Sequence, residues 1–237
     1  MMHRYLYGQS QYVRSSLVLA VGIALALIAA GCGGGDAVHS SGEATPDRLP
    51  EPAISAELTN PLEVGDEVPA VEVRNLDDET LDLSRVVAEK PTVIIFYRGG
   101  WCPYCNTHLG ALAEVEPRLL ELGYQVLAIS ADRPGKVQET REEFGFGYRL
   151  LSDAKMRAAR ALGIAFHVAE ATLEQYEDYG IRLEEASGQT HHLLPVPSVF
   201  IAGTDGVIRF AHSNPDYKVR LEPEKVVAAA EEALEKD

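Results

Sequence analysis

Cysteine and tryptophan are scarce in this chain of 237 residues, which contains three cysteines and one tryptophan. Three cysteines are too few for the disulfide framework of small secreted domains, so the fold must depend on an apolar core. Basic side chains are also in short supply: 21 lysines and arginines against 36 acids leave a formal net charge of −15. Nucleic-acid phosphates attract the opposite sign, which argues against DNA or RNA as a partner. Apolar residues make up 46% of the chain, which excludes wholesale disorder.

Acidic residues are absent from the first 30 positions. Arg4 and Arg14 precede an apolar run over 17–30, which suits the core of a signal peptide and is short for a membrane span. The run ends in small residues before Cys32, and this resembles the bacterial lipobox, where the cysteine is lipidated and the chain is cut before it. We therefore expect residues 1–31 to be a signal peptide and the mature protein to be an extracytoplasmic lipoprotein of the bacterial cell membrane. The alternative is an uncleaved membrane anchor in which Cys32 is incidental.

Apolar periodicity is missing from residues 32–60, which are rich in Gly, Ser, Ala, Pro and acids. Such a composition predicts a flexible linker, lipidated at its first residue. We expect a single folded domain over residues 61–237.

Strands and helices alternate in the pattern of this domain. Two β-branched and aromatic runs, at 92–97 and 124–130, predict strands that are buried on both faces. The helical stretch 103–122 between them implies a βαβ unit with parallel strands. An Asp-Gly turn within 198–210 predicts an antiparallel hairpin, and 222–236 predicts a final amphipathic helix. This order predicts an α/β fold of three layers with a central mixed sheet, as in thioredoxin.

Two cysteines stand three positions apart in the segment Gly99–Cys105, where the first strand meets the helix. Such a pair can form a disulfide, and a helix N-terminus stabilises a thiolate at Cys102. Cys105 continues the apolar stripe of the helix, so we expect Cys102 to be the accessible attacking thiol and Cys105 its shielded partner. A structural disulfide or a zinc site would use the same pair, but there is no second CxxC. A c-type haem would need histidine where Asn106 stands, and we expect no metal or cofactor.

Three segments together resemble the peroxiredoxin-like branch of the AhpC/TSA family in the thioredoxin superfamily: 65–69, 96–105 and 204–209. The resemblance covers nearly the whole domain. It implies a thioredoxin-like fold and a thiol-dependent antioxidant oxidoreductase whose redox-active residues are Cys102 and Cys105.

The resemblance also has departures at the positions that carry peroxide chemistry. It places Cys105 at the peroxidatic cysteine of the family, Cys102 at a hydroxyl residue, Arg98 at a proline and Pro197 at a distant arginine. Pro197 stands before a strand, where thioredoxins carry a cis-proline that faces the CxxC. We expect Pro197, Arg98 and Trp101 to contact substrate; the alternatives are a strand-entry proline and a solvated loop arginine.

Two mechanisms follow from this resemblance. In the first, Cys105 attacks a hydroperoxide, Cys102 resolves the sulfenic acid to a disulfide, and a thioredoxin-like or other thiol donor reduces it. In the second, Cys102 attacks a protein disulfide and Cys105 releases the mixed disulfide, as in a membrane-tethered disulfide reductase. We expect the first. A metallochaperone that uses the two cysteines and a histidine is a third, more distant alternative.

Other candidates are weaker. His191 and His192 could approach the dithiol but fit an exposed loop better, and His108 is expected on the surface of its helix. Residues 164–195 are expected to be an insertion between core elements, with a helix over 170–179.

Overall fold

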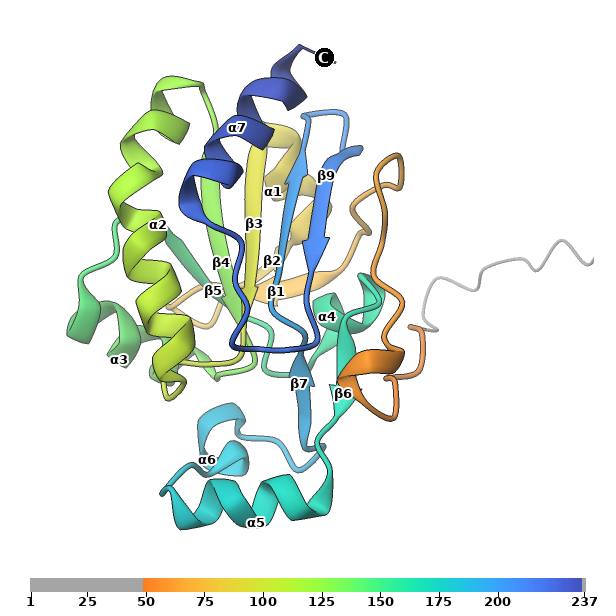
Figure 1. Ribbon diagram of the computed structural model, residues 1–237, viewed down its shortest axis with the longest axis vertical. Coiled ribbons are helices and arrows are strands. Elements are labelled where there is room, and N and C mark those ends of the chain that lie inside the picture. The colour runs from red at the N-terminus through yellow and green to blue at the C-terminus, as the bar shows by residue number, and fades with distance from the viewer. Residues whose placement is uncertain (1–48, 236–237) are drawn as a thin grey trace, which may run out of the picture. The chain divides into compact units, whose positions relative to one another are not determined.

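A seven-stranded mixed sheet forms the centre of the computed structural model, which describes residues 49–235 (Figure 1). The strand order is β2-β1-β5-β4-β3-β8-β9, and β6 and β7 form a separate two-stranded sheet. The strands are β1 (Glu72–Arg74), β2 (Thr80–Asp82), β3 (Thr92–Tyr97), β4 (Gln125–Ser130), β5 (Arg149–Ser152), β6 (Ala165–His167), β7 (Leu193–Pro195), β8 (Ser198–Ala202) and β9 (Ile208–Ser213). The helices are η1 (Ala56–Leu58, 3-10), α1 (Leu83–Glu89), α2 (Pro103–Glu121), α3 (Pro134–Phe144), α4 (Arg157–Ala161), α5 (Glu170–Asp178), α6 (Leu183–Ser187) and α7 (Pro223–Leu234).

Strand β3 lies in the middle of the sheet, and all six of its residues are buried. It runs parallel to β4, with Thr92 opposite Gln125 and Tyr97 opposite Ser130, and antiparallel to β8. A strand covered on both faces needs a continuous apolar run, which is what the sequence provides there. The predicted βαβ unit and the antiparallel β8–β9 hairpin are both confirmed.

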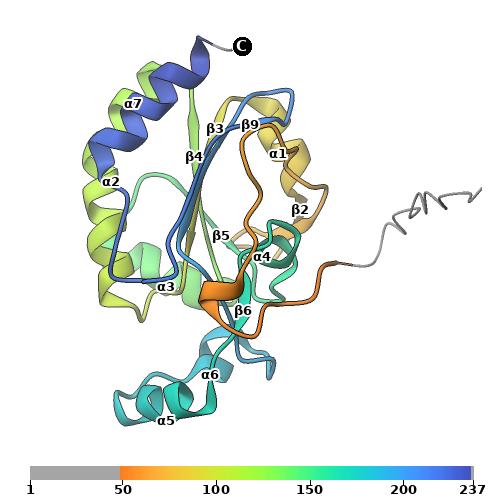
Figure 2. The same ribbon diagram turned by 45° about the vertical axis from the view of Figure 1, so that its right-hand side comes forward.

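Helices cover the sheet on two sides, as Figure 2 shows: α2 and α7 pack on one face, and α1 and α4 on the other. Each face buries its own apolar cluster. Val93, Ile95 and Val199 belong to the α2–α7 side, while Ile94 and Phe200 belong to the α1–α4 side. The period of two along β3 and β8 distributes their side chains between the two clusters. The predicted three-layer α/β fold is confirmed.

The insertion between α4 and β8 contains β6, α5, α6 and β7. It extends beyond the end of the sheet at which β3 terminates (Figure 1). Its helix α5 spans Glu170–Asp178, which confirms the predicted helix over 170–179. The insertion therefore stands next to the junction between β3 and α2, where the CxxC lies.

The predicted boundary between linker and domain is wrong, because residues 49–60 lie against the domain. Ala53 pairs with the start of β6: its N–H donates to the carbonyl of Ala165 at 2.9 Å, and its carbonyl accepts from His167 at 2.9 Å. The N–H of Asn60 donates to the carbonyl of Gly163 at 3.1 Å, and a Cβ at Gly163 would lie 2.0 Å from the Asn60 carbonyl oxygen. These backbone contacts depend little on side chains, which is why composition alone reads the segment as linker.

The predicted signal peptide (1–31), Cys32 and the rest of the expected linker up to residue 48 lie outside the described residues. Among the helices of residues 49–235, none has both the length and the apolar character needed to cross a membrane.

Candidate active site

The two thiols of the CxxC lie at the start of α2 and are both reduced. Cys102 is the N-cap of the helix and Pro103 its first residue, as the sequence predicts. Cys102 is only 1% exposed and Cys105 is fully buried. The prediction that Cys102 is the accessible thiol is therefore wrong. Both cysteines pack in the apolar cluster on the α2–α7 side, which also includes Leu221 from the segment before α7.

The two thiols differ strongly in acidity. The pKa of Cys102 is lowered to about 6, because its thiolate accepts a hydrogen bond from the Cys105 thiol and lies near the positive charges of Arg98 and Arg220. These interactions outweigh the effect of burial. Burial, together with the neighbouring Cys102 thiolate, raises the pKa of Cys105 well above its ordinary value. The resting pair therefore holds one negative charge, on Cys102, and one proton, on Cys105.

Arg98 is buried, with 4% of its surface exposed, so its interpretation as a solvated loop charge is wrong. Its guanidinium lies over three aromatic rings from three parts of the chain: 5.1 Å from Trp101, 5.4 Å from Tyr176 of α5, and 4.1 Å from Tyr217. It also donates a hydrogen bond to the Tyr176 hydroxyl. Tyr217 in turn packs edge-on against Tyr104 of the CxxC, with 5.6 Å between ring centroids. Arg98 thus joins the insertion and the β9–α7 connection to the dithiol.

Trp101 lies beside the dithiol, as predicted, and is partly buried between the two apolar clusters. Its ring centroid is 5.6 Å from that of Tyr176.

Arg220 is a site residue that the sequence analysis misses. Its Nη2 donates to the Sγ of Cys105 at 3.3 Å, across 115 positions of sequence. The β9–α7 connection (residues 214–222) carries it, and this segment passes the carboxyl end of β3 next to the first turn of α2 (Figure 1). No local motif marks Arg220, since only the path of the connection brings it to the sulfur.

Pro197 precedes β8 and lines a small cavity together with Arg220. Residues 49–235 contain no cis peptide bond, so the expectation of a cis-proline at this position is wrong. The Pro197 carbonyl accepts from the N–H of Asn214 at 3.4 Å, which ties the start of β8 to the β9–α7 connection.

Of the three histidines considered in the sequence, His108 differs from expectation. His108 is buried rather than on the helix surface: its Nε2 bonds the Leu221 carbonyl at 2.9 Å, and burial lowers its pKa to about 4. His191 is partly buried, and its Nε2 makes a hydrogen bond with the Ala154 carbonyl oxygen at 2.9 Å. His192 Nε2 makes a hydrogen bond with a carboxylate oxygen of Glu184 in α6, also at 2.9 Å. His191 and His192 lie in the loop before β7, as expected, and each makes a hydrogen bond there.

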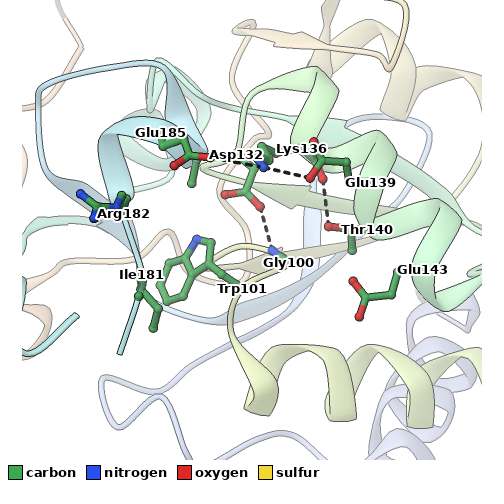
Figure 3. Close-up of a pocket in the computed structure, with 12 residues that line it drawn as sticks. Gly100, Trp101, Asp132, Lys136, Glu139, Thr140, Glu143, Ile181, Arg182 and Glu185 are labelled. Atoms are coloured by element: carbon green, nitrogen blue, oxygen red, sulfur yellow. Dashed lines mark hydrogen bonds and ion pairs between the residues drawn. The ribbon is translucent and has the colours of Figure 1, made fainter. Parts of the chain in front are cut away.

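A cleft of about 250 Å³ opens beside Trp101, between α3 and the insertion (Figure 3). Asp132 lines it, is 2% exposed, and accepts the N–H of Gly100 at 2.7 Å. Burial raises the pKa of Asp132 to about 7. A Cβ at Gly99 would lie 2.3 Å from the Trp101 Nε1 and 2.6 Å from an Asp132 oxygen. The close packing of the backbone at residue 99 against these two side chains therefore requires glycine.

Within residues 49–235, no group of three or more His, Cys, Asp or Glu side chains is arranged to hold a metal ion. A metallochaperone would need such a ligand set from this part of the chain, so the geometry gives that alternative no support.

Comparison with known proteins adds a family relationship. Residues 64–211 match the family model described as the AhpC/TSA family. The matched range includes both cysteines of the CxxC and ends before Tyr217 and Arg220.

The curated relatives are peroxiredoxins. Peroxiredoxin bcp1 of Schizosaccharomyces pombe is 28% identical over 121 residues, which cover 51% of this chain and 62% of the yeast protein. Peroxiredoxin Bcp of Escherichia coli K12 is 28% identical over 105 residues, which cover 44% of this chain and 67% of the relative. The chain thus spans less than two thirds of the yeast relative.

Among solved structures, peroxidoxin BcpB of Mycobacterium tuberculosis superposes with a TM-score of 0.57 at 20% identity. The superposition covers 72% of this chain and 97% of the other, and it shows a shared fold.

Proposed function

Because the chain belongs to the AhpC/TSA family, we propose that it is a peroxiredoxin-like peroxidase that reduces hydroperoxides with its Cys102–Cys105 pair. The observation that carries this proposal is the burial of both thiols at the N-terminus of α2, where the pKa of Cys102 is lowered. The thiolate, rather than the thiol, is the nucleophile, and a pKa of about 6 keeps the pair ionised at neutral pH.

The cycle needs no cofactor. A sulfur of the pair attacks one oxygen of the hydroperoxide, so that an S–O bond forms, the O–O bond breaks, and an alcohol or water leaves. The product is a sulfenic acid. The second sulfur displaces its oxygen as water, which leaves a Cys102–Cys105 disulfide. An external thiol donor, thioredoxin-like or small, then returns two electrons and two protons to the pair.

Reduction of protein disulfides is the second candidate function, and the low pKa of Cys102 at the N-cap favours it. Burial argues against it, because a protein disulfide must reach a sulfur that is 1% exposed or less. A hydroperoxide presents a single oxygen to the sulfur and needs a much smaller opening.

The test is carried out on the full-length chain. Hydrogen peroxide consumption with dithiothreitol and the reduction of insulin disulfides are measured for the wild type, the Cys102→Ser/Cys105→Ser variant and, as a matched control, Cys32→Ser. We expect peroxide consumption by the wild type and Cys32→Ser and none by the double variant. Robust insulin reduction without peroxide consumption would instead assign the protein as a disulfide reductase.

We also propose that Cys32 anchors the protein to the outer face of the bacterial membrane through a lipid. The support is the charge-free apolar run that ends in small residues before this cysteine. Expressed with its leader in a bacterium that processes lipoproteins, the wild type is expected in the membrane fraction. The Cys32→Ser variant is expected to carry no lipid label. It is also expected to keep its leader uncleaved. Equal labelling of both proteins with a fatty-acid probe would contradict the assignment.

A further inference from the structure

The cleft beside Trp101 is lined mainly by charged side chains (Figure 3). Its two walls are α3 and the insertion, and Lys136 of α3 connects them: its Nζ lies 2.9 Å from a Glu139 oxygen and 3.6 Å from a Glu185 oxygen of α6. Trp101, which directly precedes Cys102, forms part of the lining. With a volume of about 250 Å³, the cleft has room for a molecule the size of an amino acid beside the CxxC.

Three other charged side chains at this cleft are incompletely paired. Asp132 is buried; one of its oxygens accepts the Gly100 N–H at 2.7 Å, whereas the other has no hydrogen-bond partner among the described residues. The Trp101 indole lies near this second oxygen and favours the carboxylate, but it is not aligned for a hydrogen bond. Arg182 and Glu143 are exposed, and their side chains make no hydrogen bond or ion pair within residues 49–235. Buried polar atoms are rarely left unpaired, so Asp132 indicates a ligand that donates to it.

The unpaired charges are spread along the cleft by sign. In Figure 3, Arg182 and Glu143 lie at opposite ends, with Trp101 and Asp132 between them. One end is therefore positive, while the middle and the other end are negative. An α-amino-acid group carries a carboxylate and an ammonium side by side, which complements this order of charges.

The burial of the dithiol limits the size of the molecule that can reduce it. Cys102 is 1% exposed and Cys105 is fully buried, so the cysteine pair of a protein donor has the same difficulty in reaching them as a protein disulfide. A small thiol needs a much smaller opening. Because Trp101 lines the cleft and Cys102 is the next residue, a small thiol held there has to extend only past the indole to reach a sulfur.

We propose that this cleft binds the electron donor, and that the donor is a small thiol with an α-amino-acid group, whose ammonium faces Asp132 and whose carboxylate faces Arg182. The inference rests on the proposed function, which makes the Cys102–Cys105 disulfide the form to be reduced. The donor thiolate attacks Cys102 Sγ, so that a mixed disulfide forms, the Cys102–Cys105 bond breaks, and Cys105 leaves and takes a proton. A second donor thiolate then attacks the donor sulfur of the mixed disulfide, which releases the donor disulfide and the Cys102 thiolate.

The experiment measures reduction alone, without peroxide. The full-length Cys32→Ser chain, whose two thiols are those of the CxxC, is oxidised with diamide and then mixed with one of four thiols. L-Cysteine carries both charged groups, cysteamine only the ammonium, N-acetylcysteine only the carboxylate, and dithiothreitol neither. Each rate is divided by the rate at which the same thiol reduces a small aromatic disulfide, which removes differences in intrinsic reactivity.

Two variants in this background remove one charge each. Asp132→Asn keeps an oxygen that can accept the Gly100 N–H, and Arg182→Gln changes an exposed side chain. The controls are Glu114→Gln on α2 and Arg141→Gln on α3. Both are exposed, lie outside the lining of the cleft and make no side-chain ion pair within residues 49–235.

For the unmutated cleft, we expect the corrected rate with cysteine to exceed those with cysteamine and N-acetylcysteine by about tenfold each, as the loss of one charge-assisted hydrogen bond predicts. The rate should also level off as the cysteine concentration rises. Arg182→Gln is expected to abolish the advantage over cysteamine, and Asp132→Asn the advantage over N-acetylcysteine. Reduction by dithiothreitol should stay the same in both variants.

Equal corrected rates for the four thiols, or the same losses in the two control variants, would overturn this inference and leave the proposed function intact. A chain that prefers cysteine in this way but does not consume hydrogen peroxide would overturn the proposed function and leave the assignment of the cleft standing.

Discussion

Replacing Cys105 by serine is expected to abolish the reaction with peroxide, whereas replacing Cys102 should stop turnover but leave one oxidation per molecule. The reason is that the family resemblance places Cys105 at the peroxidatic cysteine, and that Arg220 Nη2 donates to its Sγ at 3.3 Å. In Cys105→Ser no sulfur is left at this point, and we expect the rate of peroxide reaction to fall by about a thousandfold or more. In Cys102→Ser the sulfenic acid forms but has no partner thiol to condense with.

The measurement is stoichiometric: each reduced variant is mixed with one equivalent of hydrogen peroxide, and the sulfenic acid is trapped with dimedone and located by mass spectrometry. Adduct at Cys105 in Cys102→Ser, and none in Cys105→Ser, is the expected pattern. Cys32→Ser serves as the control, since it keeps the dithiol. The opposite pattern, with adduct at Cys102 only, would show that Cys102, the more acidic thiol, is the sulfur that attacks the peroxide.

Replacing Arg98 by methionine is expected to raise the pKa of Cys102 from its value of about 6 and to destabilise the fold. The guanidinium favours the charged form of the thiol, so its loss shifts the titration to higher pH and leaves less thiolate at neutral pH. Methionine fills much of the same volume, but it cannot replace a cation held over the rings of Trp101, Tyr176 and Tyr217. We expect a loss of about 2 kcal/mol in the free energy of unfolding.

Two measurements check the Arg98 prediction: the thiolate absorbance in the ultraviolet as a function of pH, and urea unfolding under reducing conditions. Arg85→Met is the matched control, because Arg85 is exposed and its nitrogen lies 3.9 Å from Asp82, too far for a strong ion pair. The control should leave both values unchanged. An unshifted titration in Arg98→Met would show that Arg98 does not stabilise the thiolate.

Local sequence patterns predict the central strands and helices of this protein well. The continuous apolar run of β3, the stripe along α2 and the Asp-Gly turn between β8 and β9 each depend on neighbouring residues, and all three are confirmed. The place of Cys102 at the N-cap, with Pro103 in the first helical position, follows from the same local rules.

The parts that the sequence does not predict depend on contacts between distant residues. Cys102 is buried rather than exposed because residues from α2, α5 and the β9–α7 connection converge on the CxxC. Arg220 reaches Cys105 across 115 positions, and no spacing rule encodes this contact. Residues 49–60 have the composition of a linker, yet backbone hydrogen bonds, which any sequence can make, attach them to β6.

The arrangement around Trp101 also gives the protein an intrinsic optical probe. Trp101 is the one tryptophan of the chain, stands next to Cys102, and has the Arg98 guanidinium 5.1 Å from its ring and the ring of Tyr176 5.6 Å away. All of its tryptophan emission therefore comes from one indole that borders the dithiol, the insertion and both apolar clusters. Oxidation of the pair, or a shift of α5, changes the surroundings of this indole, so stopped-flow fluorescence can follow each half of the redox cycle without a label.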